Sequence, residues 1–124
     1  GSVGIMQGFK SFMLQAEDGS ATLPTSSLAS GINFYSAGPE HSYLKKIGRV
    51  NYTYATDEEA FEAFQLICKT EGILIAFEPA FAVAFGIKLA KKMGKEKILV
   101  LNICGRGDKD IDTAEKILGN KLDE

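Results

Sequence analysis

Histidine and cysteine are scarce in this sequence, which excludes two kinds of site. His41 is the only histidine, and the two cysteines, Cys68 and Cys104, lie far apart. No Ser/His/Asp or Cys/His triad can be assembled when one histidine must serve every role. The short-spaced Cys/His patterns of zinc sites are missing too. We also expect no disulfide, because the rest of the chain is typical of a reduced cytoplasmic domain.

Long apolar runs and a strong charge of one sign are absent as well. No apolar run approaches the ~20 residues that a membrane span needs, and no basic segment leads into an apolar one near the start. The formal net charge of −2 offers no basic surface for nucleic acid. We therefore expect a cytoplasmic protein that binds neither membranes nor nucleic acid, with no anchor or signal peptide.

The length and the second half of the chain predict one α/β domain over residues 1–124. The chain of 124 residues, 45% hydrophobic, is long enough for one domain with a core. Strands are predicted at residues 50–54, 73–77 and 98–103, the first by alternation and the others by continuous apolar residues. Strands that alternate with helices predict a three-layer, mostly parallel sheet with crossover helices, in the order strand-helix-strand-helix-strand-helix over residues 50–119.

Helix boundaries are marked by capping residues and glycines. Thr56 and Glu59 form a capping box at the start of one helix, and Gly72 fits its end. The next helix is predicted from Pro79 to Met93. Ile111 opens a last helix that ends before Gly119, and a short helix runs from Pro39 to Gly48 in the first half.

The rest of the first half has no clear pattern. Its apolar segments in residues 3–15 are broken by Gly8, and "AEDGS" predicts a turn. The long connection over residues 20–38 is a candidate for site material, because unstructured loops of this length are often functional.

Polar or small residues follow two of the predicted strands. Glu78 ends one, and Cys104, Gly105, Arg106 and Gly107 end the other, so neighbouring strands would bring them into one crevice. Glu78 either caps the next helix or faces a ligand. The Gly-x-Gly pattern either holds a phosphate or only makes a tight turn, in which the charged residues 106 and 108–110 are solvated or pair with one another. Cys104 either packs or reacts.

Five stretches, in order along the whole chain, resemble the carboxyl-terminal part of the tryptophan synthase β chain family. They are "GSVGIMQGFKSFMLQ", "SGINFYSAGPEHSYLKKIGR", "TDEEAFEAF", "TEGILIAFE" and "NICGRGDKD". The resemblance implies a fold-type II pyridoxal-phosphate enzyme, a lyase of tryptophan biosynthesis that joins indole to L-serine and releases water.

The resemblance also implies roles for particular residues. Cys104 stands where the family has a serine that bonds the pyridine nitrogen of the cofactor. Glu78, Gly31 and Gly105 would lie beside the cofactor. The backbone carbonyls of Phe34 and Ser36 would bind a monovalent cation, whose third ligand lies outside this chain.

Several residues depart from the family pattern. Asn33 replaces an aspartate that helps to close a mobile domain by pairing with an arginine, so we expect that closure to be weakened. Pro79, Ala80 and Phe81 replace two serines and a histidine beside the expected pocket. These changes put ordinary tryptophan synthesis in doubt.

The family's Schiff-base lysine, phosphate loop and catalytic glutamate match no motif here. We therefore expect a fragment that is inactive alone, with the amino-terminal half of a β chain as partner. The α chain, a β–β homodimer and self-association through exposed apolar surface are further predicted partners. Two alternatives are an isolated or engineered non-catalytic α/β domain of this family and a small phosphate-binding module that uses the Gly105 turn.

Overall fold

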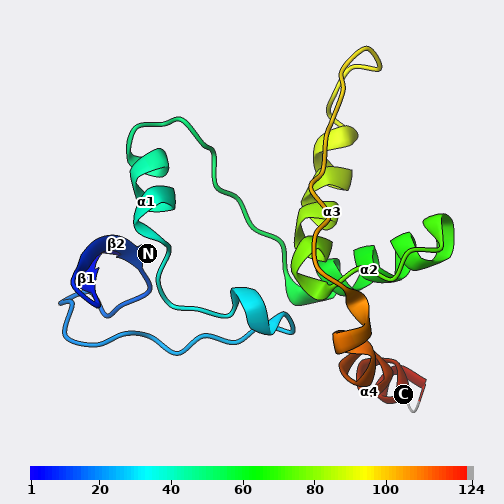
Figure 1. Cartoon of the computed structure of the whole chain (residues 1–124), viewed down its shortest axis with the longest axis horizontal. Helices are drawn as coiled ribbons and strands as arrows, with labels where there is room; N and C mark the ends of the chain where they lie inside the picture. The colour runs from blue at the N-terminus through cyan, green and yellow to red at the C-terminus, as the bar shows by residue number, and fades with distance from the viewer. Residues whose placement is uncertain (123–124) are drawn as a thin grey trace. The chain divides into compact units, whose positions relative to one another are not determined.

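The computed structural model describes residues 1–122, which divide into two compact units, one over Gly1–Thr53 and one that begins at Tyr54. Helices and strands are both present, so the coarse α/β assignment is confirmed (Figure 1). The elements are, in order, β1 (Ser2–Met6), β2 (Phe9–Met13), η1 (Ser30–Ile32), α1 (Pro39–Lys46), α2 (Asp57–Glu71), α3 (Phe77–Ala90), η2 (Gly107–Asp110) and α4 (Ile111–Leu122). Among residues 1–122, no helix is long and apolar enough to cross a membrane.

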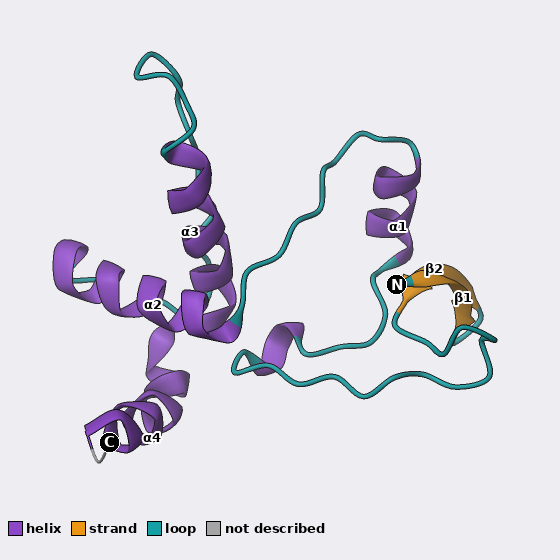
Figure 2. Ribbon diagram, turned by 180° about the vertical axis from the view of Figure 1, so that it is seen from behind, coloured by secondary structure: helices purple, strands orange, loops and turns teal. Residues whose placement is uncertain are grey.

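The first unit is built on a β-hairpin that the sequence did not reveal. Strands β1 and β2 pair antiparallel, with Ser2 opposite Met13 and Met6 opposite Phe9. The turn residues, Gln7 and Gly8, both have positive φ angles, 47° and 86°, as a type I′ hairpin turn requires. In Figure 2, these are the two strands drawn in orange.

Buried serines join β2 to the helix of the first unit. The Ser11 hydroxyl bonds the Ala37 carbonyl oxygen and lies 3.1 Å from the Ser42 hydroxyl, which accepts from the Phe12 amide at 3.0 Å. Ser42 belongs to α1, which begins at Pro39 as predicted.

Helix α2 of the second unit forms as its capping residues predict. The Thr56 hydroxyl accepts from the Glu59 amide at 3.3 Å, and the Glu59 carboxylate accepts from the Thr56 amide at 3.0 Å. The hydrogen bond from Lys88 of α3, followed by that from the Thr56 amide, lowers the pKa of Glu59. Gly72 ends the helix in the left-handed conformation, with a φ angle of 67°.

The core of the second unit lies between α2 and α3. Phe61, Phe64 and Phe77 form an aromatic cluster with ring centroids 5.0–6.1 Å apart. Burial of each ring contributes roughly 1.5–3 kcal/mol. Alanines from both helices, Ala60, Ala63, Ala80 and Ala84, let the helices approach closely.

The predicted parallel sheet is not formed by residues 1–122, whose one sheet is the hairpin. Residues 50–54, 73–76 and 98–103 have no strand assignment. A strand exists only when a neighbour pairs with its backbone, and an apolar pattern does not supply that neighbour. Residues 98–104 instead run beside α3 as a single extended segment (Figures 1 and 2).

Two predicted helix boundaries also need correction. Helix α3 begins at Phe77, two residues before Pro79, and ends at Ala90 rather than Met93. Pro79 still lies in the first turn, where a missing amide costs no helical hydrogen bond. Helix α4 continues through Gly119 to Leu122, because one glycine in a helix costs only about 1 kcal/mol.

Candidate functional site

The carboxyl end of segment 98–104 meets the start of α3 in the second unit. The Gly107 amide donates to the Leu74 carbonyl oxygen at 3.2 Å, which joins the two segments that the sequence placed in one crevice. A Cβ atom on Gly107 would collide with the Ile75 carbonyl oxygen. Only glycine therefore allows this backbone approach.

Gly105 makes the turn that leads to this contact. Its φ angle of 77° lies in the left-handed region, which favours a residue without Cβ. An added Cβ would lie 3.3 Å from Ala76 Cβ, tighter than ordinary contact. Cys104, just before this turn, is an exposed free thiol.

Asp110 anchors the start of α3 from a distant part of the sequence. Its Oδ2 atom accepts from the Phe77 amide at 2.9 Å. Ala76, the N-cap residue, has no side-chain oxygen to do so. Asp110 is buried and thus supplies the acceptor that the local sequence lacks.

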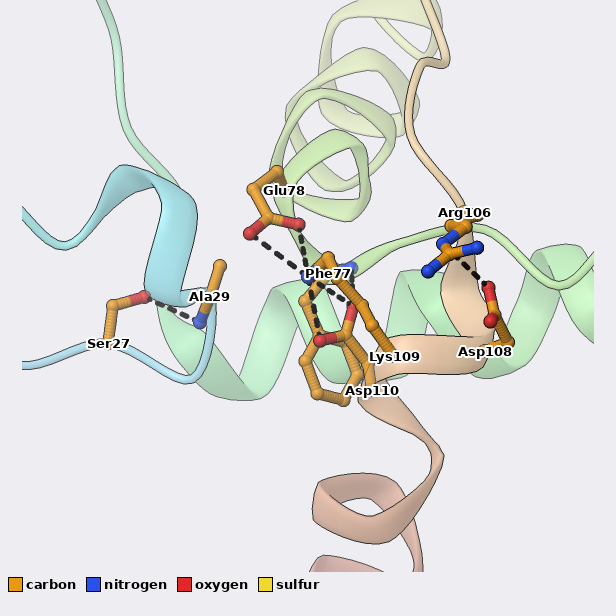
Figure 3. A network of polar contacts seen from close by, with 8 residues as sticks. All are labelled: Ser27, Ala29, Phe77, Glu78, Arg106, Asp108, Lys109 and Asp110. Carbon is orange, nitrogen blue, oxygen red and sulfur yellow. Dashed lines mark hydrogen bonds and ion pairs between the residues drawn. The ribbon is translucent and has the colours of Figure 1, made fainter.

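Lys109 bridges two carboxylates at this junction (Figure 3). Its Nζ lies 2.9 Å and 3.1 Å from the two oxygens of Glu78 and 2.8 Å from each oxygen of Asp110. Burial alone would lower the pKa of Lys109, but hydrogen bonds and charges from Asp110 and Glu78 together raise it above 10.5. Lys109 is therefore a fixed cation at neutral pH, not a free amine.

Arg106 and Asp108 form a separate, exposed ion pair, with Arg106 Nε 3.5 Å from Asp108 Oδ1 (Figure 3). The interpretation that these charged residues pair with one another is thus confirmed for Arg106 with Asp108 and for Lys109 with Asp110. The alternative that Glu78 caps α3 holds only in part. Glu78 lies in the first turn of α3, but the Phe77 amide at the start of the helix donates to Asp110.

Pro79, Ala80 and Phe81, which were predicted to replace polar residues after Glu78, lie in α3. Pro79 and Ala80 are buried in the core of the second unit, and Phe81 is half-buried. These apolar side chains lie on the helix that packs against α2.

The predicted cation ligands lie in the first unit, beside β2. Tyr35 and Ala37 turn their carbonyls toward β2, where the Leu14 amide bonds Tyr35 at 2.7 Å and the Ser11 hydroxyl bonds Ala37. Ser36 bridges Met13 between these bonds, so its carbonyl points to the other side, as alternate carbonyls do in an extended chain. Within residues 1–122, no group of three or more His, Cys, Asp or Glu residues could hold a metal ion.

Gly31 and Asn33 lie in and just after η1, also in the first unit. The Asn33 Oδ1 atom is buried and has no hydrogen-bond donor among the described residues. A buried acceptor without a donor costs about 1–3 kcal/mol.

No model of a known protein family matches this chain. Among curated proteins, the tryptophan synthase beta chain of Allorhizobium ampelinum is 50% identical to it over 122 residues, or 98% of the chain. The chain is similar to a tryptophan synthase beta chain over nearly its whole length. It spans 30% of the length of that protein.

The likeness to a tryptophan synthase beta chain confirms the resemblance on which the sequence-based site was built. It covers both units, and therefore all the predicted residues. The cofactor contacts of Gly31, Glu78, Cys104 and Gly105 stay predictions, as does the cation site.

Sequence reasoning missed the positioning roles of Lys109 and Asp110. The sequence held no signal for these roles, because the helix was predicted to begin at Pro79 with Glu78 as a possible cap. Only the structure shows that α3 begins after Ala76, whose side chain has no acceptor, so that a residue from elsewhere supplies it.

Proposed function

We propose that this chain forms the carboxyl-terminal cofactor-domain portion of a cytoplasmic tryptophan synthase β chain. The complete protein would convert L-serine and indole to L-tryptophan and water, with pyridoxal phosphate as cofactor. The identity of 50% over 98% of the chain is the observation that carries this proposal. Because the chain spans 30% of that relative, we propose that it is inactive alone.

The second unit fits the ring of such a cofactor. Gly105 has no Cβ, so a flat ligand could approach the backbone at that turn. The Cys104 thiol would offer a weak donor to the pyridine nitrogen, and Lys109 would hold the Glu78 carboxylate in a fixed orientation. The bound cofactor would supply the electron sink for elimination and replacement at the β carbon of the amino acid.

The second unit does not fit the other attachment points of the cofactor. Lys109 is held between two carboxylates with a raised pKa, and a protonated amine is not a nucleophile. The acidic residues Asp108 and Asp110 line the turn after Gly105, which disfavours a phosphate there. We propose that the Schiff-base lysine and the phosphate loop come from the rest of the enzyme, and the Gly105 turn does not support a separate phosphate-binding function.

The remaining predictions follow from the same proposal. The two units would pack as one domain, with residues 50–54, 73–77 and 98–103 as strands of a three-layer parallel sheet completed by the amino-terminal half of a β chain. The carbonyls of Phe34 and Ser36 would bind a monovalent cation. An α chain and a second β chain are the further partners.

Complementation in trans tests the proposed function. The part of the A. ampelinum relative that this chain does not match is produced separately and mixed with the chain, pyridoxal phosphate, L-serine and indole. We expect tryptophan to form only in the mixture, and no aldimine absorbance band when the chain alone meets the cofactor. Activity of the chain alone, or an inactive mixture, would contradict the proposal.

Exchange of the thiol tests its predicted contact with the ring. We expect Cys104→Ser to bind pyridoxal phosphate about two- to tenfold more tightly in the complemented enzyme, because a hydroxyl donates a stronger hydrogen bond. The reaction type should not change. Cys68→Ser, a substitution of the half-buried thiol on α2, is the matched control and should leave cofactor affinity unaltered. Equal affinities for Cys104→Ser and the unsubstituted chain would place the ring elsewhere.

A further inference from the structure

A groove of about 470 Å³ lies between the β-hairpin and α1 in the first unit, where α1 packs against β2 (Figure 2). Its side chains come from both walls and include Val3, Lys10, Phe12, Pro39, Tyr43 and Lys46. Lys10 and Phe12 are two residues apart on β2, and Val3 is the partner of Phe12 on β1, so these three share one face of the hairpin. The other three are spaced three and four residues apart along one side of α1. The volume of the groove is within the range of small-molecule sites.

The two walls of the groove are held together by polar groups that are already satisfied. Ser11 and Ser42, both buried, also border the groove. The Ser11 hydroxyl bonds the Ala37 carbonyl oxygen, and the Ser42 hydroxyl accepts from the Phe12 amide at 3.0 Å. Because these hydroxyls have partners within the protein, a ligand would meet mainly apolar side chains in a groove that needs little rearrangement.

The charged side chains that line the groove are both cations. Within residues 1–122, neither Lys10 nor Lys46 has an ion-pair partner, and no described Asp or Glu lines the groove. Two ammonium groups beside apolar side chains attract an anion, and the attraction strengthens where those side chains displace water. The groove therefore has the features of a site for a ligand with one apolar and one anionic part.

We propose that this groove binds a small apolar monocarboxylate. Its carboxylate would pair with the ammonium groups of Lys10 and Lys46, and its apolar group would pack against Phe12 and Tyr43. Lys46 is the last residue of α1, where the partial negative charge of the helix end favours a monoanion over a phosphate dianion.

The proposed site is additional to the proposed function. None of the predicted cofactor or cation residues lines the groove. Binding of a carboxylate can therefore be measured without tryptophan formation, and a failure of one proposal leaves the other standing.

Calorimetric titration of the 124-residue chain with 3-phenylpropionate tests the site. We expect a dissociation constant of about 1 mM or lower. The neutral 3-phenylpropionamide has nearly the same shape, and we expect it to bind at least about tenfold more weakly because it cannot form an ion pair. Equal affinities for the two compounds, or no binding of either, would overturn the proposal.

Removal of the two cations tests their role. We expect the double variant Lys10→Met, Lys46→Met to bind 3-phenylpropionate at least about tenfold more weakly and the amide unchanged, because methionine keeps an unbranched apolar chain without the charge. The matched control is Lys69→Met, Lys92→Met, which removes the same charge at exposed positions of the second unit and should bind both compounds normally. Equal loss of carboxylate binding in the two double variants would overturn the proposal, since net charge alone would explain the affinity.

Removal of an aromatic ring tests the apolar contact. Tyr43 is 60% exposed, so Tyr43→Ala should leave the fold intact and weaken the binding of acid and amide alike, by about threefold or more. Tyr54→Ala, at an exposed tyrosine of the second unit, should change neither affinity. Unaltered binding by Tyr43→Ala would overturn the proposal. Displacement of 3-phenylpropionate by the remainder of the A. ampelinum relative would also overturn it, because that polypeptide would then be the occupant of the groove.

Discussion

Gly107→Ala is expected to destabilise the second unit by about 3 kcal/mol or more, the largest effect of any single methyl group that we anticipate in this chain. The added Cβ would collide with the Ile75 carbonyl oxygen and lie 2.7 Å from that of Leu74. Backbone atoms cannot rotate away as a flexible side chain can, so the segments must separate and lose the hydrogen bond from the Gly107 amide. Urea unfolding followed by the helical circular dichroism signal measures the loss.

Gly119→Ala is the matched control for this experiment. No described atom lies within 4 Å of an added Cβ at Gly119, which belongs to α4. Alanine favours a helix by up to about 1 kcal/mol over glycine, so the control should be neutral or more stable. Similar destabilisation by the two substitutions would mean that the contact between Gly107 and Ile75 does not hold the unit together.

Asp110→Ala is expected to cost about 2 kcal/mol or more. The substitution leaves the buried Phe77 amide without its acceptor and removes one of the two carboxylates that hold Lys109. Asp110→Asn keeps an acceptor oxygen and should lose less. The free energy of unfolding in urea, again from the helical signal, gives both values.

Asp108→Ala controls for the loss of a negative charge near Asp110. Its ion pair with Arg106 is exposed, and exposed pairs contribute less than about 1 kcal/mol. If Asp108→Ala proved as damaging as Asp110→Ala, net charge rather than the cap at Phe77 would explain the effect.

The pKa of Lys109 limits the pH range in which the bridge is intact and the variants can be compared. A pKa that is higher in the folded state than 10.5 stabilises the folded state fully below pH 10.5. That stabilisation is lost as the pH rises through the folded-state pKa. The bridge from Lys109 to Glu78 and Asp110 is therefore intact at pH 7, where the substitutions should be measured.

Under the proposed function, the junction at Gly107 would matter for cofactor contacts as well as for stability. The hydrogen bond from the Gly107 amide to Leu74 holds this junction, Lys109 pairs with Glu78 there, and Cys104 lies three residues before Gly107. Substitutions that loosen the junction should therefore impair complementation even when both proposed ring contacts are retained.

The sequence alone determined the helices with local signals. The Thr56–Glu59 capping box and Gly72 predicted the two ends of α2, and Pro39 predicted the start of α1. Helical hydrogen bonds and caps join residues three or four apart, so a short stretch contains the information needed to form them. The glycines at residues 105 and 107 likewise marked a local change of direction, as either a tight turn or a phosphate-holding loop.

Only the tertiary structure decided what depends on distant partners. Asp110 fixes the start of α3 from 33 residues away, and the apolar pattern at residues 98–103 did not make a strand within residues 1–122. A strand and a remote cap each need a group from another segment, and no local pattern states which segment supplies it. The sequence thus determined the helices whose ends carry local caps, whereas contacts between segments decided where strands form, including the hairpin of β1 and β2 that the sequence did not reveal.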